Sequence, residues 1–330
     1  METKINWGII GCGNVTEFKS APAFSKVEDS RLVAVMRRNE VLAEDYAKRH
    51  NVPKWYTNAD ELINDTEVNA VYIATPPSSH AFYAIKAMQA GKPVYVEKPM
   101  AATYKQCLEM NEVSKNTGVP LFVAYYRRTL PAFLKVKELI DNNTIGTPLI
   151  VNIRLMRGAS PEEISKENPA WRVNPDIAGG GIFYDLASHQ LDYFDFLFGQ
   201  IVDVSGIAVN RAGLYAVEDT VTGIFKFESG VIASGTWCFV TEPNAREDII
   251  EITGTKGKIV FSTFKVAPIV LTTEKGTEEF HCQNSENIQF NLIKQIVGVL
   301  KGEGQCVSTG ETAARTNLVM EKVVESFYGR

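Results

Sequence analysis

The chain has 330 residues, of which 45% are hydrophobic and 22% charged, and its formal net charge is -5. These ordinary values exclude disorder as the main state and argue against nucleic acid as the main partner. At roughly 150 residues per domain, the length predicts two domains, each large enough for its own core.

The first predicted element is an apolar strand at 5–10, which leads into Gly11-Cys12-Gly13-Asn14-Val15-Thr16. Gly11 and Gly13 allow a tight turn and the close approach of a pyrophosphate. A helix beginning near Asn14 and Val15 points its unpaired N–H groups at the phosphates. Thr16 stands where the usual dinucleotide fingerprint has a third glycine, so an ordinary turn between strand and helix also fits. The pattern favours a nucleotide-binding start.

The second predicted strand, at 32–36, ends where an acidic residue would bind the ribose 2′-hydroxyl of NAD. Arg37 and Arg38 stand there instead, and guanidinium groups can pair with a 2′-phosphate. NADP is therefore the preferred cofactor, with NAD possible. In the alternative interpretation both arginines are solvated surface charges and Glu40 serves the ribose.

Further strands are predicted near 54–56, 70–74, 94–96 and 121–124, separated by helices at 41–50, 59–64, 81–90 and 104–117. Strands that alternate with helices form parallel sheets with right-handed crossovers, and the carboxyl ends of the strands line the ligand crevice. We therefore predict an N-terminal α/β domain of the Rossmann type over residues 1–125. The residues expected near the cofactor ring or ribose at these strand ends are Thr75, Pro76 and Pro77.

The pattern changes after residue 150. Longer alternating runs appear at 149–155, 202–210, 220–227 and 231–237, followed by a hairpin-like stretch at 249–261. Helices are expected at 181–198, 287–300 and 312–327. This pattern predicts a C-terminal α+β domain over 126–330 with a large, mostly antiparallel open sheet. Because few helices remain to cover the sheet, one face is expected to be left for another subunit.

Two segments far apart in the sequence carry side chains suited to acid–base catalysis. Lys98 follows the predicted strand at 94–96, and Asp185 and His189 follow a run of three glycines at 179–181. A spacing of four residues places Asp185 and His189 on one helix face, roughly 40° apart. A lysine that polarises an oxygen and a base that takes its proton are what reversible hydride removal from an alcohol requires.

Each of these residues also has a structural interpretation. Lys98 could be a surface lysine, although its place between Glu97 and Pro99 at a strand end constrains it. An isolated His189 among apolar neighbours would be a core histidine, but Asp185 one turn earlier favours a cleft. Asp192 fits either a partner of this pair or a helix-packing hydrogen bond.

The chain has no stretch that approaches the ~20 apolar residues of a membrane helix. Residues 1–4 lead directly into the first strand, so we expect neither a signal peptide nor a membrane partner. The five cysteines are scattered without C-x-x-C spacing, which favours reduced thiols, a cytoplasmic protein and no metal site.

The motifs Glu97-Lys98-Pro99 and Gly179-Gly180-Gly181-x3-Asp185-x3-His189-x2-Asp192 resemble those of the oxidoreductase family that includes glucose-fructose oxidoreductase and inositol 2-dehydrogenase. Members similar to anhydrofructose reductase come nearest, because of Tyr125-Tyr126-Arg127-Arg128 and Trp171-Arg172. The resemblance implies an enzyme that oxidises or reduces sugars or polyols and forms dimers or tetramers through its C-terminal sheet. It also implies catalytic roles for Lys98 and His189, substrate binding by Asp185, and a cis Lys98–Pro99 bond.

The resemblance and the loop positions complete the set of predicted site residues. Glu97 is expected to orient Lys98 and, with His80 and Arg127, to lie near the cofactor; Arg157, Trp171 and Arg172 are candidates for the substrate pocket. Two alternative functions stay open. One is a redox-neutral hydrolase that oxidises and re-reduces a sugar ring with a tightly held nucleotide, and the other is a sensor that binds NADP without catalysis. The sequence does not identify the sugar.

Overall fold

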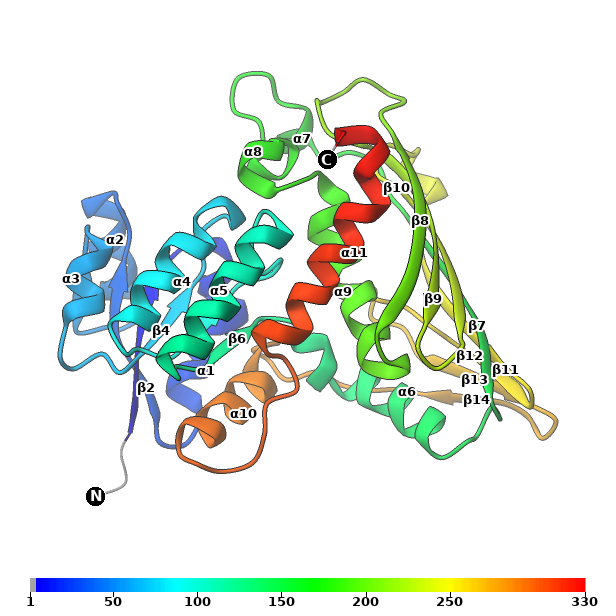
Figure 1. Ribbon diagram of the computed structural model, residues 1–330, viewed down its shortest axis with the longest axis horizontal. Helices are drawn as coiled ribbons and strands as arrows, with labels where there is room; N and C mark the ends of the chain where they lie inside the picture. The colour runs from blue at the N-terminus through cyan, green and yellow to red at the C-terminus, as the bar shows by residue number, and fades with distance from the viewer. Residues whose placement is uncertain (1–3, 330) are drawn as a thin grey trace. The chain divides into compact units, whose positions relative to one another are not determined.

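The computed structural model describes residues 4–329 and divides the chain into two compact units (Figure 1). The first unit contains residues 4–129 and 285–314, and the second contains 130–284 and 315–329. The sequence-based ranges were 1–125 and 126–330, so the segments 126–129 and 285–314, which belong to the first unit, depart from them. The segment 285–314 returns to the first unit because its helix α10 (Phe290–Leu300) packs on α1 (Ala21–Lys26) through an apolar face that Ile293 and Val297 share.

The first unit is built on a six-stranded sheet in the order β3-β2-β1-β4-β5-β6, with every pair parallel. This confirms the predicted Rossmann topology. Except for the half-buried edge strand β3, its strands are short apolar runs with mostly buried residues, as parallel strands covered by helices require. The strands are β1 (Ile5–Ile10), β2 (Ser30–Met36), β3 (Lys54–Tyr56), β4 (Ala70–Ile73), β5 (Val94–Val96) and β6 (Leu121–Val123).

Two helices of this unit have clear capping residues in the sequence. The side chain of Asn39 caps the helix that follows β2. The helix that follows β5 begins with a capping box of Thr103 and Gln106 and ends at Gly118 in the left-handed region. In chain order the helices are η1 (Thr16–Ser20), α2 (Glu40–Arg49), α3 (Ala59–Asn64), η2 (Pro77–Ser79), α4 (His80–Gln89), α5 (Tyr104–Thr117) and η3 (Tyr126–Thr129).

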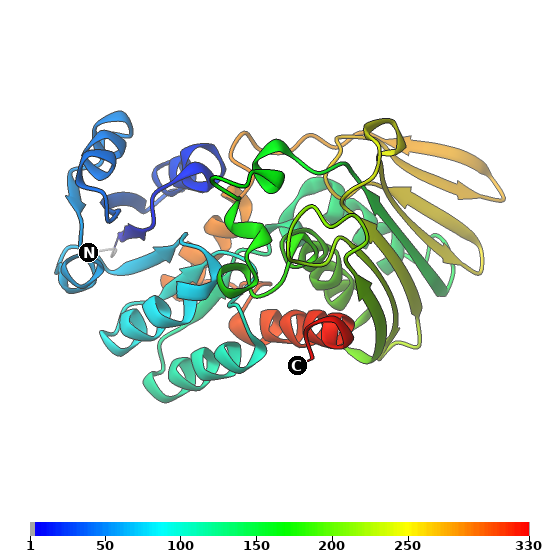
Figure 2. The same ribbon diagram turned by 90° about the horizontal axis from the view of Figure 1, so that it is seen from above.

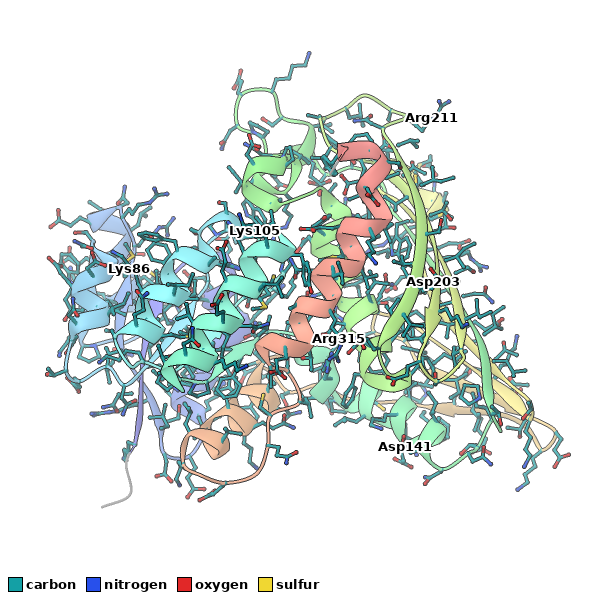
Figure 3. The ribbon with its side chains drawn as sticks, viewed as in Figure 1. Lys86, Lys105, Asp141, Asp203, Arg211 and Arg315 are labelled. Atoms are coloured by element: carbon teal, nitrogen blue, oxygen red, sulfur yellow. The ribbon has the colours of Figure 1, made fainter. Side chains whose placement is uncertain are left out.

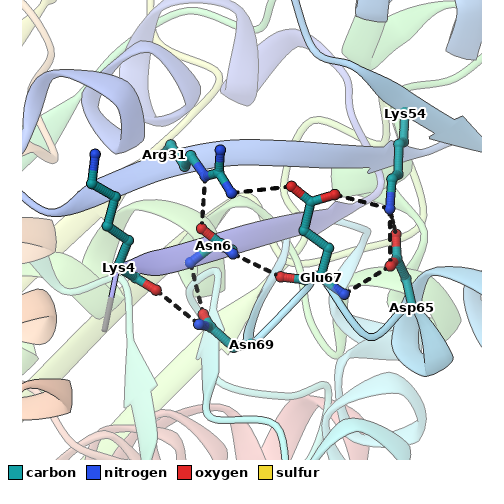
Figure 4. Close-up of polar contacts among 7 residues, drawn as sticks. All are labelled: Lys4, Asn6, Arg31, Lys54, Asp65, Glu67 and Asn69. Atoms are coloured by element: carbon teal, nitrogen blue, oxygen red, sulfur yellow. Dashed lines mark hydrogen bonds and ion pairs between the residues drawn. The ribbon is translucent and has the colours of Figure 1, made fainter. Parts of the chain in front are cut away.

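A polar network joins the amino ends of these strands (Figure 4). Arg31 Nε donates to Asn6 Oδ1 at 2.8 Å, and Lys54 Nζ lies 2.8 Å from Asp65 Oδ2. The backbone N–H of Asn6 donates to Asn69 Oδ1 at 2.7 Å, which ties the loop before β4 to β1. Since ligands of parallel sheets bind at the carboxyl ends of the strands, this network serves the fold.

The second unit contains an eight-stranded sheet in the order β14-β13-β12-β11-β7-β10-β9-β8. All neighbours are antiparallel except β7 and β10, which confirms a large, mostly antiparallel sheet. The last two strands at one end of the sheet, β13 and β14, were not predicted. The strands are β7 (Pro148–Met156), β8 (Ile201–Val209), β9 (Thr220–Phe227), β10 (Ile232–Cys238), β11 (Glu247–Gly254), β12 (Gly257–Phe261), β13 (Ile269–Thr273) and β14 (Gly276–Phe280).

Helices cover one face of this sheet, as two views of the ribbon show (Figures 1 and 2). They are α6 (Pro131–Asp141), which was not predicted, α9 (Ile182–Phe198), and α11 (Gly310–Tyr328) from residue 315 onward. Arg315, labelled in Figure 3, pairs with Asp195 at 2.5 Å and so fastens α11 to α9. The short helices are α7 (Pro161–Ile164), η4 (Trp171–Val173), α8 (Pro175–Ala178) and η5 (Pro243–Ala245).

Residues alternate along the strands between the covered and the open face. Val151, Ala233 and Phe225 point into the core, whereas Ile150 and Ile232, which face each other across β7 and β10, are exposed. The open face therefore carries apolar side chains. Within residues 4–329, no helix is long and apolar enough to cross a membrane.

Candidate active site

The turn after β1 has the geometry of a phosphate cradle. Gly11 has φ of 92°, and its N–H donates to the Met36 carbonyl at 2.9 Å. The Thr16 hydroxyl accepts from the Gly13 N–H at 3.0 Å and donates to the Gly13 carbonyl at 2.7 Å. Thr16, which replaces the third glycine, thus closes the turn itself, and it is the first of the five residues of η1, which form a π-helical turn.

The two glycines of this turn differ in what surrounds them. A Cβ on Gly11 would lie 2.6 Å from Thr75 Cγ2 and 2.9 Å from the Thr75 backbone N, whereas a Cβ on Gly13 has its nearest neighbour at 3.9 Å. Gly11 is therefore needed for the fold. Gly13 leaves open space at a helix start, and this space fits the pyrophosphate of a dinucleotide.

We expect Gly11→Ala and Gly13→Ala to separate these two roles. Gly11→Ala places a residue with a side chain in the left-handed region and pushes its Cβ against Thr75. It should lower the free energy of unfolding by about 1–3 kcal/mol. Gly13→Ala should keep the wild-type melting temperature but weaken dinucleotide binding at least about tenfold, since its methyl group occupies the cradle. Thermal unfolding and titration with NADPH and NADH measure both effects; unchanged affinity in Gly13→Ala would remove Gly13 from the cradle.

Arg37 and Arg38 follow β2 directly beside this turn. Arg37 is half-buried and Arg38 exposed. Burial raises the pKa of the Cys12 thiol to about 11, and the positive charge of Arg37 acts on that thiol in the opposite direction. Within the described residues neither guanidinium forms a hydrogen bond or an ion pair. Glu40, the alternative partner of the ribose, is exposed at the start of α2.

The segment after β4 contacts the glycine turn through Thr75. The Thr75 hydroxyl accepts a hydrogen bond from Ser79 at 2.7 Å, and the Ser79 side chain forms no capping hydrogen bond to α4. Pro76 is exposed and Pro77 buried. His80, the first residue of α4, is fully buried and contacts the carbonyl oxygen of Thr75.

Glu97 lies at the centre of a buried network at the end of β5. Its Oε1 accepts from the Tyr72 hydroxyl at 2.6 Å and from Gln289 Nε2 at 2.6 Å, and its Oε2 accepts from the Lys98 N–H at 3.2 Å. The Tyr95 hydroxyl donates to Gln289 Oε1 at 2.7 Å. Burial, and next the charge of Glu97, raise the pKa of the Tyr72 and Tyr95 hydroxyls well above the usual value, so both stay protonated donors.

This network fixes the backbone at the predicted catalytic lysine. The Lys98–Pro99 bond is cis, as the resemblance implied. Gln289 was not predicted, because a single glutamine almost two hundred residues away carries no local signal. Arg127, which follows β6, is buried with its guanidinium 5.3 Å from the Tyr126 ring centre.

In the second unit, the start of α9 is built around Gly181. Its N–H donates to Glu218 Oε1 at 2.9 Å, and a Cβ there would lie 2.8 Å from the Glu218 carboxylate. Tyr328 of α11 donates to the other carboxylate oxygen. A buried carboxylate at a helix N-terminus stabilises the helix. The glycine run therefore allows Glu218 to hold the helix that carries Asp185 and His189.

Arg172 and Asp185 form an ion pair on the open side of this helix. Arg172 Nε donates to Asp185 Oδ2 at 2.7 Å, and the guanidinium lies 4.5 Å from the Trp171 ring centre. His189, one turn later, is 3% exposed with its ring centre 6.0 Å from that of Phe264. Trp171, Arg172 and Asp185 are thus brought together, and Asp192, two turns further along α9, is completely buried.

Arg157 is bound to a different carboxylate of this unit. It pairs through both terminal nitrogens with Glu163, at 2.9 and 2.5 Å, and this carboxylate also accepts from the Ser160 N–H as part of a capping box. The first unit therefore holds Gly11, Thr75, His80, Glu97 and Lys98, while Arg157, Trp171, Arg172, Asp185 and His189 belong to the second. The substrate-binding roles of the second set stay predictions.

Two family models match the chain. The model of an oxidoreductase family with an NAD-binding Rossmann fold matches residues 5–125, and the model of the GFO/IDH/MocA C-terminal domain matches residues 133–260. Together they cover most of both units.

The chain is also similar to individual proteins. It is 42% identical to Oxidoreductase P35 of Formosa agariphila over 97% of this chain and 98% of that protein. It is 29% identical to the scyllo-inositol 2-dehydrogenase (NAD(+)) of Bacillus subtilis over 96% of this chain and 90% of that protein. The structure of a levoglucosan dehydrogenase with NADH and levoglucosan superimposes on this chain with a TM-score of 0.88 at 22% identity. The match covers 99% of this chain and 98% of that protein. That likeness shows the shared fold.

Proposed function

Because the chain belongs to the GFO/IDH/MocA family of oxidoreductases with an NAD-binding Rossmann domain, we propose that it transfers a hydride between a nicotinamide cofactor and a sugar, sugar derivative or polyol. The observation that carries the proposal is the placement of Lys98 at the carboxyl end of β5, fixed by the buried Glu97 network. The relatives named for a polyol and a sugar substrate support this substrate class.

In this proposal Lys98 and His189 serve one substrate oxygen. During reduction His189 gives a proton to that oxygen, and the Lys98 ammonium stabilises the developing alkoxide. During oxidation His189 takes the proton from the substrate hydroxyl, and Lys98 again stabilises the alkoxide. A bound nicotinamide supplies or accepts the hydride. Arg172 pairs with Asp185, and in this proposal the Asp185 carboxylate accepts a hydrogen bond from a neighbouring substrate hydroxyl or orients the His189 imidazole.

The first test mixes the protein with NADPH, and in parallel NADH, against ketoses, aldoses and sugar dicarbonyls while nicotinamide absorbance is followed. Consumption of the reduced cofactor with one compound class supports the proposal. Release of sugar without added nucleotide would instead favour the redox-neutral hydrolase, and nucleotide binding without any turnover would favour a sensor.

We further propose that NADP is the preferred cofactor, since Arg37 and Arg38 are available to a 2′-phosphate at the end of β2. Arg37→Ala/Arg38→Ala should weaken NADPH binding at least about 10- to 100-fold, the value of one charge-assisted hydrogen bond, and leave NADH binding unchanged. Arg31→Ala, at the opposite end of β2, is the matched control because Arg31 is engaged with Asn6 and Glu67. A wild-type protein that binds NADH more tightly than NADPH would contradict the proposal.

We also propose that the open face of the second unit's sheet joins subunits into a dimer or tetramer. Its exposed apolar side chains lie on four neighbouring strands and include Ile150, Ile207, Ile224 and Ile232. Apolar patches of this kind mark protein interfaces. Ile224→Lys/Ile232→Lys should dissociate the assembly in analytical ultracentrifugation without lowering the melting temperature of the subunit; a wild-type monomer would exclude the interface.

A further inference from the structure

His80 connects two loops at the carboxyl ends of neighbouring strands. Its ring is fully buried, with Nε2 2.7 Å from the Thr75 carbonyl oxygen and Nδ1 3.1 Å from the Pro99 carbonyl oxygen. Thr75 follows β4, and Pro99 follows β5. Both ring nitrogens are therefore occupied by backbone oxygens, which leaves neither for a cofactor or substrate.

Each of the two carbonyls belongs to a segment with a proposed role. Thr75 packs directly against Gly11 of the glycine turn, where any side chain on Gly11 would collide with it. Pro99 is joined to Lys98, whose other neighbour, Glu97, is bound by Tyr72 and Gln289. The imidazole thus lies between the predicted dinucleotide cradle and the predicted catalytic lysine.

We propose that His80 is a positioning residue that sets the Thr75–Pro77 cofactor segment and the Lys98–Pro99 segment at a fixed separation. The proposal rests on the proposed function, because it assigns His80 a task in placing the lysine and the cofactor. It specifies the expectation that His80 lies near the cofactor, since it assigns the ring a structural task beside the cofactor segment.

The chemistry of the ring defines how this link works. Carbonyl oxygens only accept hydrogen bonds, and a neutral imidazole has one N–H, so it satisfies one of the two carbonyls. Burial lowers the pKa of His80, while the Thr75 carbonyl, the charge of Glu97 and the backbone at 99–100 act in the opposite direction. At neutral pH the shorter contact assigns the N–H to Nε2 and Thr75.

Two substitutions and a control test the link. His80→Leu removes both contacts, and should weaken NADPH binding and lower kcat about tenfold each, the value of one or two hydrogen bonds. His80→Gln keeps one amide donor and should recover at least half of both losses on a logarithmic scale. Met88→Ala removes buried volume from the other end of α4 without touching either loop, and reports what destabilisation alone does.

Nuclear magnetic resonance supplies a readout without turnover. The chain has four histidines, so ¹⁵N-labelling of their rings gives a spectrum that single variants can assign. One slowly exchanging ring N–H should be present in the wild type and missing in His80→Gln. A rapidly exchanging His80 ring would overturn the proposal.

The remaining outcomes distinguish a failure of the His80 proposal from a failure of the proposed function. Wild-type affinity and kcat in His80→Leu, or losses equal to those of Met88→Ala, would make His80 an ordinary core residue. NADPH binding is measured by nicotinamide fluorescence in the absence of sugar. A protein that turns over no sugar, but whose NADPH affinity falls in His80→Leu and recovers in His80→Gln, would refute the proposed function and retain the role of His80 at the cofactor segment.

Discussion

Lys98→Met is expected to lower kcat about 100- to 1000-fold in either direction, the range found when a group that stabilises a developing oxyanion is removed. Methionine keeps the length and the apolar stem of lysine, so the Glu97 network and the cis bond to Pro99 should persist. The dissociation constants of NADPH and NADH should therefore stay within about threefold, because the backbone contacts that build the cradle are untouched. Stopped-flow hydride transfer and fluorescence titration measure the two quantities.

Lys105→Met is the matched control for this variant. Lys105 is an exposed lysine in the first turn of α5, labelled in Figure 3, and its removal should leave both kcat and cofactor affinity unchanged. Wild-type turnover in Lys98→Met would remove this lysine from the mechanism. Loss of cofactor affinity equal to the loss of kcat would instead make Lys98 a binding residue, with no separate role in the chemical step.

His189→Gln is expected to reduce kcat/KM for sugar reduction about 100- to 10 000-fold, the usual contribution of a positioned general acid. Glutamine has a donor of similar reach but no proton to release. The limb of the pH profile that the imidazole produces should disappear, while the affinity for cofactor stays at the wild-type value. A pH series of kcat/KM measures this result.

The control for His189→Gln comes from the adjacent position. Ser188 is buried, and its hydroxyl donates only to the Asp185 carbonyl one turn earlier, so Ser188→Ala perturbs the same turn of α9 without removing a proton donor. Ser188→Ala should retain most activity and an unchanged pH profile. If both variants lose activity equally and keep the wild-type profile, α9 packing accounts for the effect, and His189 is the core histidine of the alternative interpretation.

The Rossmann unit was predictable because its signals are local. Each strand of the first sheet is a short apolar run, and each intervening helix has its own cap, such as Asn39 or Thr103. Thr16 shows the limit of this reasoning. Its hydroxyl closes the glycine turn by two hydrogen bonds to Gly13, which a fingerprint that counts glycines does not anticipate.

The second unit was predicted less completely for a physical reason. The strands β7 to β10 alternate clearly because one face is buried and the other open. The outer strand β14 is exposed along four of its five residues, so its sequence lacks the alternation that burial imposes. Helix α6 was missed although Pro131 stands at its first position, a known start signal.

The sequence by itself determined the fold class of both units, the position of Lys98 at the end of a parallel strand, and the placement of Asp185 and His189 on one helix. These features depend on periodicity and spacing within short segments. Only the tertiary structure decided which distant groups contact the residues around them. Gln289 binds Glu97, Glu218 binds the Gly181 N–H, Arg172 binds Asp185, and the Pro99 carbonyl contacts His80. Such partners are chosen by the closure of long loops and by the need to satisfy buried polar atoms, and neither leaves a pattern in the local sequence.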